Sequence, residues 1–518
     1  MKKSSLFHIC FIIFISAFII SCTAQNGVAG SDRSGDKGGG KRGGGGRQSN
    51  FVPTFPRTSE VAPGQAIADI SKKPANIKLG VVKHDTKKTF KGYTLFAPKH
   101  WLTTHLIDME GREINSWKSD YEPGQSVYLL DNGNLLHCCM TKNQDFIGGG
   151  EGGRIEEYNW EGDMVWSLWY SDSTKLAHHD IEPMPNGNIL MMVVEKKTPE
   201  DMIAAGFSSS TSGRQGRGDG SLFAEYIVEI ERFGSKGYNE VWEWHIWDHL
   251  VQDNDPSKAN YGVVAEHPGR LTASAGRGGF WNHGNSIDYN PKLDQIILSA
   301  RGQSELWVID HSTTTEEAKG RTGGKYGKGG DLLYRWGNPA MYDAGTRDDQ
   351  KLFLQHDPHW ILPGCPGEGN ILIYNNGKGR GYSTVEEIVP PVDKNGFYPK
   401  LKPGEAYEPK EQHWVFTTEP KSKMYSTEIS GAQRLPNGNT LVCAGTYGRF
   451  MEVTPDKEIV WEYAAPFDGN GPLKQGDPVL LDVRGHQMNA VFKVHRYAPD
   501  YPAFKGRDMT PGESLVRK

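Results

Sequence analysis

A weak internal repeat constrains the fold more than any other feature of this sequence. Each copy has two short apolar runs rich in β-forming residues, joined by a turn. Three copies carry Asn-Gly at the turn, in Ser126–Leu136, Asp180–Leu190 and Gly431–Leu441, and two have looser turns, in Ser286–Leu298 and His359–Leu372. Asn-Gly is a strong short-range hairpin signal, because both turn positions of a tight hairpin need positive φ. The repeat therefore predicts a chain built from successive β-hairpins.

A tryptophan in a β-rich strand after a polar turn closes each unit. These tryptophans recur about every 70 residues, a spacing that fits propeller blades of short strands. They are Trp117, Trp166, Trp242, Trp336, Trp414 and Trp461. Six such positions predict an all-β protein with a six-bladed β-propeller, and a pair of stacked β-sandwiches is the alternative.

The two ends of the repetitive region predict how the ring closes. Asn489–Val494 has the composition of a last strand, and Gly92–Phe96 that of a first strand. A closed ring has no open sheet edge. We therefore expect the C-terminal strand near Val491 to join the blade that contains the strand near Thr94.

The N-terminus has the features of an export signal. Two lysines precede an apolar run that is too short to span a membrane, and the run ends in Ile19-Ile20-Ser21-Cys22. The pattern resembles a bacterial lipobox and predicts a lipoprotein signal peptide over 1–21, with lipid on Cys22. The alternative is an ordinary signal peptide with an incidental cysteine. The lipobox interpretation places the protein outside the cytoplasm, lipid-anchored to the bacterial cell envelope on the periplasmic side or at the cell surface.

Residues 22–50 form a second segment, a lipidated Gly-rich tether. Ten of residues 27–50 are glycine, and such a stretch cannot bury enough apolar surface to order itself. We expect a disordered spacer here and the propeller domain over 51–518. The formal net charge of the chain is −5, and nothing in the sequence predicts binding to nucleic acid. The cysteine spacing predicts neither a disulfide framework nor a zinc site.

Histidine recurs where the first strand of a unit begins. The five starting positions hold Ser126, His178-His179, His283, His356 to His359, and Ser430. First strands of propeller blades line the central channel, so we expect His179, His283 and His356 to meet there as catalytic candidates for acid-base or nucleophilic chemistry. Imidazoles from different blades can also bind zinc, but Asp180 and Asp357 should alternate away from them, so we predict no metal.

The turn that follows Asn375 adds two substrate-binding candidates, Asn376 and Arg380. Arginine suits tetrahedral oxyanions because its fork of N–H donors matches their oxygens. The alternative for Arg380 is a solvated charge on a loop.

Several stretches of the sequence resemble the bacterial arylsulfotransferase family, and together they extend from about Gly92 to Arg507. They are Gly92–Pro98, His178–Pro183, Asn282–Ile287, Gln355–Asp357, Asn375–Gly377 with Arg380, and Ser430–Asn439. The resemblance implies an exported six-bladed propeller that moves a sulfuryl group from an aryl sulfate to a phenol through a histidine. It also implies that neither a nucleotide donor nor any other cofactor is needed.

When this sequence is matched to the family motif by motif, the resemblance implies that His283 and His356 contact the sulfuryl group. It also implies that Arg380 is the arginine of the same site. It leaves open which histidine carries the group, since the strand at Ser430–Gln433 holds none. Two other functions fit the same residues, a polysaccharide lyase and a non-catalytic module that binds sulfated or anionic glycans. The expected partners are therefore a small aryl sulfate and a phenol or a sulfated glycan, together with the membrane through the lipid anchor.

Overall fold

The computed structural model describes residues 77–146, 149–207, 220–273, 281–481 and 486–518. These residues belong to one compact unit, 51–518. The expected signal peptide over 1–21 and tether over 22–50, including Cys22, lie outside the described residues. Among the described residues, no helix has the length and apolar character to cross a membrane.

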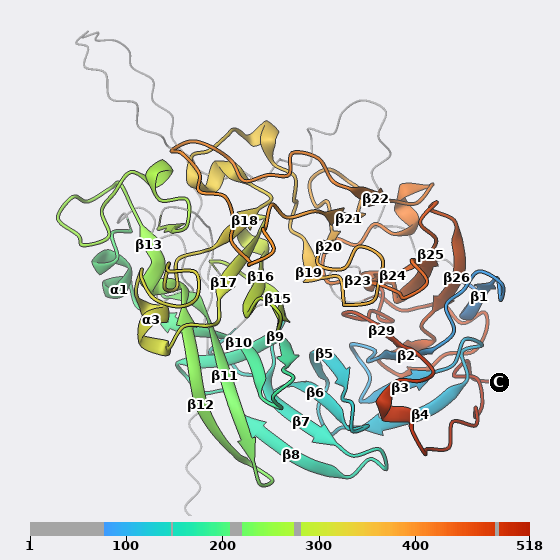
Figure 1. Ribbon diagram of the computed structural model, residues 1–518. Coiled ribbons are helices and arrows are strands. Elements are labelled where there is room, and N and C mark those ends of the chain that lie inside the picture. The colour runs from blue at the N-terminus through green and yellow to red at the C-terminus, as the bar shows by residue number, and fades with distance from the viewer. Residues whose placement is uncertain (1–76, 147–148, 208–219, 274–280, 482–485) are drawn as a thin grey trace, which may run out of the picture. The chain divides into compact units, whose positions relative to one another are not determined.

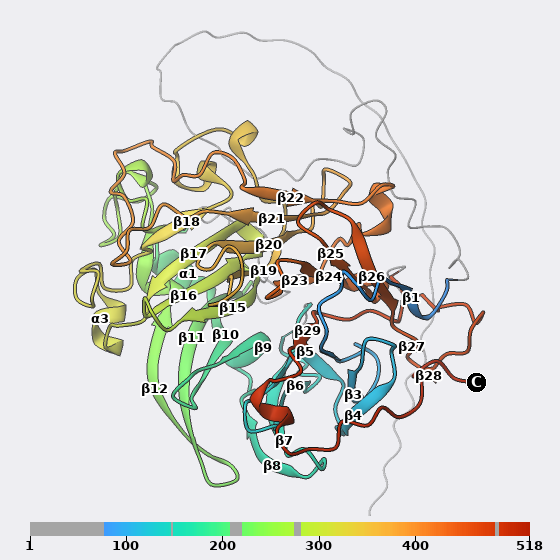
Figure 2. The same ribbon diagram turned by 45° about the vertical axis from the view of Figure 1, so that its right-hand side comes forward.

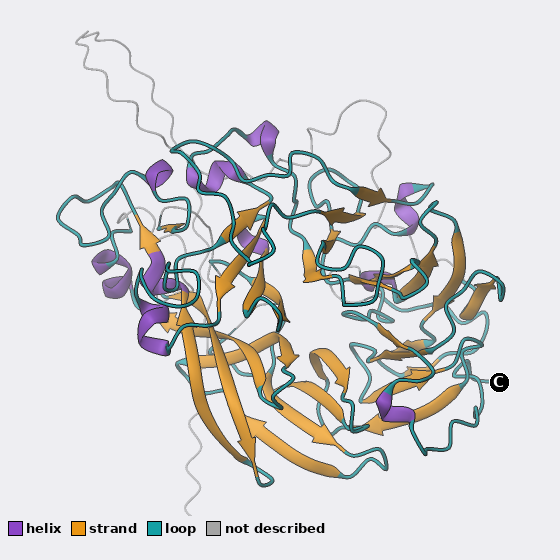
Figure 3. Cartoon of the chain, viewed as in Figure 1, coloured by secondary structure: helices purple, strands orange, loops and turns teal. Residues whose placement is uncertain are grey.

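Strands dominate the described residues (Figure 3). Two short α-helices, α1 (Pro199–Ala204) and α3 (Thr315–Lys319), each begin with a threonine that forms a capping box. Four further strands form two small pairs outside the main sheets, β13 (Leu250–Val251) with β14 (Leu271–Thr272) and β27 (Phe467–Asp468) with β28 (Gly471–Pro472).

Six antiparallel sheets form the six blades of a propeller (Figures 1 and 2). Blade 1 is β29 (His495–Tyr497), β2 (Tyr93–Phe96), β3 (Thr103–Ile107) and β4 (Glu113–Lys118); blade 2 is β5 (Pro123–Leu129), β6 (Leu135–Met140), β7 (Gly153–Tyr158) and β8 (Met164–Trp169). Blade 3 is β9 (Lys175–Pro183), β10 (Ile189–Lys197), β11 (Leu222–Phe233) and β12 (Gly237–His245); blade 4 is β15 (Gly284–Asn290), β16 (Gln295–Ala300), β17 (Glu305–Asp310) and β18 (Tyr334–Trp336). Blade 5 is β19 (His356–Trp360), β20 (Ile371–Asn375), β21 (Thr384–Ile388) and β22 (Trp414–Phe416); blade 6 is β23 (Gly431–Arg434), β24 (Thr440–Ala444), β25 (Arg449–Val453) and β26 (Ile459–Ala464), with β1 (Gly80–His84) outermost. The prediction of an all-β six-bladed propeller is confirmed.

The ring closes twice. Strand β29 pairs with β2, with Arg496 opposite Thr94, and an isolated bridge joins Val491 to Pro98. Strand β1 pairs with β26 and adds a fifth strand to blade 6. The predicted pairing of the two ends in one blade is correct, but the closing strand is His495–Tyr497 and not Asn489–Val494, where Val491 forms only an isolated bridge. The second closure by β1 was not anticipated.

Each of the six repeating tryptophans lies on the outermost strand of the blade proper. Its indole N–H donates a hydrogen bond to the loop that joins the third and fourth strands of the next blade. The donor–acceptor pairs are Trp117 to Asn159 O, Trp166 to Gly237 O, Trp242 to Thr313 Oγ1, Trp336 to Pro409 O, Trp414 to Pro455 O and Trp461 to Met109 O. The tryptophans therefore recur because each one fastens two neighbouring blades.

The Asn-Gly turns form the expected hairpins with a different backbone. Gly133, Gly187 and Gly438 have φ of 88°, 88° and 87°, whereas none of the asparagines before them has positive φ. Each asparagine side chain instead accepts a hydrogen bond from the amide two residues later, at 2.9–3.0 Å. Asparagine thus acts here through its side chain as an Asx-turn, and only the glycine needs the left-handed conformation.

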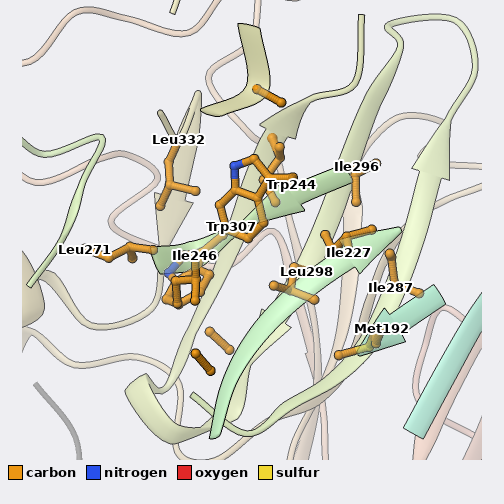
Figure 4. Close-up of a cluster of buried hydrophobic side chains, with 14 of the residues drawn as sticks. Met192, Ile227, Trp244, Ile246, Leu271, Ile287, Ile296, Leu298, Trp307 and Leu332 are labelled. Atoms are coloured by element: carbon orange, nitrogen blue, oxygen red, sulfur yellow. The ribbon is translucent and has the colours of Figure 1, made fainter. Parts of the chain in front are cut away.

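Apolar side chains fill the space between blades. Between blades 3 and 4, Trp244, Trp307, Ile227, Ile296 and Leu298 pack together, each at most 1% exposed (Figure 4). Burying one side chain of this size contributes roughly 1.5–3 kcal/mol. Because this packing occupies the faces of the sheets, the inner strand ends are left for polar residues.

Irregular backbone marks the inner strands of blades 2 to 5. Gln125, His179 and Asp357 have positive φ and lie within interruptions of the ladder to the second strand, and His283 has positive φ directly before such an interruption. Bulges of this kind re-aim side chains, and a positive φ at a residue other than glycine is uncommon. The irregularity therefore falls on the candidates His179 and His283, and in blade 5 on Asp357, next to the candidate His356.

Candidate functional site

Three histidines from blades 3, 4 and 5 form a cluster that we call the histidine cluster: His179, His283 and His356. The rings of His179 and His283 lie 4.9 Å apart between centroids in an edge-to-face arrangement. The ring of Phe492 lies 6.2 Å from that of His179 and 6.3 Å from that of His356. The expectation that the inner strand ends would bring these histidines together agrees with their placement.

Arg301 completes the cluster and was missed by the sequence analysis. It follows β16 directly, in the position that Asn376 occupies after β20 in the next blade. Its charge acts on His179, His283 and His356. Its Nε is buried without a hydrogen-bond partner, and no described residue forms an ion pair with its guanidinium. The sequence signal that could have found Arg301 is its equivalence to Asn376, since each residue directly follows the second strand of its blade.

Burial and mutual repulsion keep the imidazoles neutral. Burial, followed by the charges of the neighbouring histidines and Arg301, holds the pKa of His179 well below its ordinary value. Burial and Arg301 lower the pKa of His283 in the same way, and lower that of His356 to about 3. At neutral pH the cluster is therefore a set of uncharged imidazoles beside an unpaired guanidinium, an environment that favours an anion.

Asn376 fixes the tautomer of His356. Its Nδ2 donates to the carbonyl oxygens of Ser426 and Ile429, at 2.8 and 2.9 Å, so its Oδ1 must face the imidazole. That Oδ1 lies 2.7 Å from His356 Nδ1, which therefore carries the proton. The lone pair is on Nε2, which accepts from the Ile429 amide at 3.0 Å. Asn376, expected to bind substrate, thus orients a histidine.

Among the described residues, no contact joins Arg380 to the histidine cluster. Its guanidinium donates to Thr384 Oγ1 and to the carbonyl of Tyr382, and lies 3.5 Å from Glu386 Oε1 on β21. The ring of Tyr382 lies 4.5 Å from it. The glycine-rich turn folds this arginine onto its own blade, which sequence spacing could not reveal.

A buried ion-pair network lies beside the cluster. Lys493 Nζ is 2.8 Å from Asp180 Oδ2 and 3.3 Å from Asp357 Oδ1. Both aspartates bind this lysine, which comes from the C-terminal segment, and Asp357 Oδ2 also lies 3.8 Å from His359 Nδ1.

One other group of side chains in the described residues has ligand atoms close enough for a metal ion: His137, Cys139 and Glu156 on β6 and β7. Glu156 already accepts from Ser119, Cys139, Tyr158 and Arg154. Hydrogen bonds therefore account for the buried Glu156, whereas His137 Nε2 is buried without a hydrogen-bond partner.

Residues 101–466 match the family model described as Arylsulfotransferase (ASST). No curated protein matches the chain.

Among solved structures, the chain is similar to a protein of unknown function from Bacteroides caccae, with 10% identity over 78% of this chain and 98% of that chain and a TM-score of 0.38. It is also similar to a streptogramin B lyase, with 10% identity over 83% and 97% of the two chains and a TM-score of 0.35. A virginiamycin B lyase from Staphylococcus aureus gives 10% identity over 76% and 90% and a TM-score of 0.34. Similarities at these scores carry no argument about activity.

Proposed function

The chain belongs to the arylsulfotransferase family, and we propose that its propeller transfers a sulfuryl group from an aryl sulfate to a phenol through a histidine. The observation that carries the proposal is the unpaired guanidinium of Arg301 among three neutral imidazoles. An aryl sulfate brings an anionic tetrahedral group, which would give Arg301 the partner that it lacks.

The donor half-reaction uses a neutral imidazole as nucleophile. A ring nitrogen forms a bond to sulfur while the bond between sulfur and the aryl oxygen breaks, and the phenolate leaves with that electron pair. Arg301 and the neighbouring imidazoles bind the sulfuryl oxygens as their charge changes, the kind of stabilisation that often contributes most to group transfer.

His356 is the candidate carrier of the sulfuryl group. Asn376 holds its proton on Nδ1, so its Nε2 has the lone pair that a nucleophile needs. Its low pKa keeps it unprotonated at neutral pH. The hydrogen bond from the Ile429 amide to Nε2 breaks as sulfur binds.

The test is turnover by the purified full-length protein. A chromogenic aryl sulfate is mixed with and without a phenol, and donor labelled in its sulfate is then used to trap acid-labile label on the protein. The proposal requires acceptor-dependent release of the donor phenol and one labelled histidine, which peptide mapping identifies.

Other outcomes point to the alternatives. Saturable binding of a sulfated glycan without turnover would support a non-catalytic module. Unsaturated ends on a uronate polymer would support a polysaccharide lyase. The Ile19–Cys22 sequence supports the further proposal that the protein acts outside the cytoplasm, anchored to the membrane by lipid.

A further inference from the structure

A chain of two hydrogen bonds connects a buried carboxylate to the histidine cluster. His178 Nε2 lies 3.0 Å from Glu225 Oε2, and His178 Nδ1 lies 2.8 Å from His179 Nδ1. All three side chains are buried, at 2–4% exposure. Neither Glu225 nor His178 has a role in the reaction proposed above.

With both rings neutral, the contacts determine which nitrogen of each ring carries the proton. The other oxygen of Glu225 accepts from the Gly284 amide, so this carboxylate serves as an acceptor on both sides. His178 Nε2 must then be the donor to Glu225, which leaves the lone pair of a neutral His178 on Nδ1. Because that lone pair faces His179 Nδ1, the proton between the two rings belongs to His179. The lone pair of His179 is consequently on Nε2.

The Nε2 atom of His179 is the available end of this chain. No described residue forms a hydrogen bond with it. The ring itself is held in place, because Gly150 packs against it so closely that a Cβ at this glycine would lie within about 2 Å of the ring atoms, at 1.8 Å from Cε1 and 2.0 Å from Nε2. The ring of His283 lies on another side, at 4.9 Å between centroids.

We infer that Glu225 and His178 are positioning residues that hold His179 as the base for the acceptor phenol. This inference rests on the proposed transfer reaction. In the acceptor half-reaction the phenol O–H bond breaks and its proton bonds to His179 Nε2. The phenolate oxygen keeps the electron pair and forms the new bond to sulfur as the bond between sulfur and the carrier histidine breaks.

The carboxylate explains how the site tolerates that proton. A protonated His179 is buried and faces the positive Arg301, and both disfavour its charge. Glu225 is the negative group that reaches it, through His178. In hydrolytic triads a carboxylate orients the base histidine directly, whereas here His178 stands between Glu225 and His179.

The first test reads the tautomers directly and needs no activity. Histidine-labelled full-length protein is examined by long-range ¹H–¹⁵N NMR, with His178→Gln and His179→Gln for assignment. We expect His178 protonated on Nε2 and His179 on Nδ1. A His179 protonated on Nε2 overturns the inference, whether or not the protein transfers sulfate.

The second test separates the two half-reactions. Glu225→Gln should load label from the donor at nearly the wild-type rate, but should transfer it to a phenol of pKa near 10 about 10–100-fold more slowly. The deficit should disappear with a strongly acidic phenol that is already ionised. Glu229→Gln is the matched control, because Glu229 also lies on β11 and binds a histidine, His311, at 2.9 Å. It should change neither step.

Failure of the proposed function and failure of this inference give different results. If the wild-type protein takes up no label from the donor, the proposed function is contradicted. The NMR experiment then tests by itself whether Glu225 and His178 position His179. Equal slowing of both half-reactions by Glu225→Gln, or an equal deficit with ionised and neutral phenols, contradicts the role of His179 as the base.

Discussion

The ammonium of Lys493 lies 2.8 Å from the carboxylate of Asp180, and both side chains are almost completely buried. Asp180 comes from β9, whereas Lys493 precedes β29, the strand that closes blade 1. The pair therefore ties the end of the chain to the inner strand of blade 3. Lys493 also binds Asp357 of blade 5, so one cation neutralises two carboxylates where three blades meet.

Lys493→Met should destabilise the propeller strongly. It leaves Asp180 and Asp357 buried without their cation, which costs about 3–5 kcal/mol when one partner of a buried pair is removed. Thermal unfolding measures the effect. Lys88→Met is the control, because Lys88 and Glu458 form a pair with both side chains nearly half exposed, and it should change the midpoint little. Similar midpoints for the two variants would mean that the buried network does not secure the closure.

Arg301→Ala should abolish most of the transferase activity. Loss of the Arg301 guanidinium beside the three histidines removes the group proposed to bind the sulfuryl oxygens, with an expected cost of roughly 100-fold or more in kcat/KM. Arg380→Ala provides the comparison, since Arg380 is engaged by Thr384 and Glu386 and should lose less than about 10-fold. If Arg380→Ala had the larger effect, the roles assigned to the two arginines would be reversed.

His283→Ala and His356→Ala should both lose on the order of 100-fold in rate. They should differ in stability. His356 hydrogen-bonds to Asn376 and to the Ile429 amide, and its removal leaves these buried groups unpaired at a cost of about 1–3 kcal/mol each. His283 is partly exposed, so its variant should melt close to the wild type. Activity is to be measured beside the melting temperature for each variant. Full activity in both variants would contradict a catalytic role for these two histidines.

The stability of the propeller should fall as the pH rises from about 6.5 to 9. Burial lowers the pKa of His311, but its hydrogen bonds to Asp294 and Glu229 outweigh burial and raise it to about 9. A group whose pKa is raised in the folded state stabilises fully below its unfolded pKa and loses that contribution as the pH passes its folded pKa. The change amounts to about 3 kcal/mol, at about 1.4 kcal/mol per pKa unit. Denaturant midpoints across this range should decline in the wild type and much less in His311→Gln.

Cys22→Ser should release the protein into the soluble fraction. The prediction follows from Ile19-Ile20-Ser21-Cys22, which resembles a lipobox, and from the loss of acylation when the thiol is absent. Fractionation and mass spectrometry of the mature N-terminus measure the outcome. A wild-type protein that is soluble and carries no lipid would contradict the lipoprotein prediction.

The sequence alone determined the architecture of this protein and the elements of its site that repeat. The six tryptophans predicted six blades because each occupies an equivalent place on a fourth strand. His179, His283 and His356 were found because the repeat predicts a first strand to begin near each of them, although His179 lies within β9. Arg301 begins no strand, and its position after β16 becomes visible only when the second strands are aligned as well.

Only the tertiary structure decided what these side chains contact. Arg380 follows a flexible turn, and folding turned it onto its own blade, toward Glu386 on β21. The pairing of Glu225 with His178 joins residues 47 positions apart on different strands, and the tautomer of His179 depends on that pairing. Periodicity reports which residues share a face of a strand, because backbone geometry is local. Hydrogen-bond partners are fixed by how strands and loops distant in sequence come together in the folded chain, and local periodicity does not contain that information.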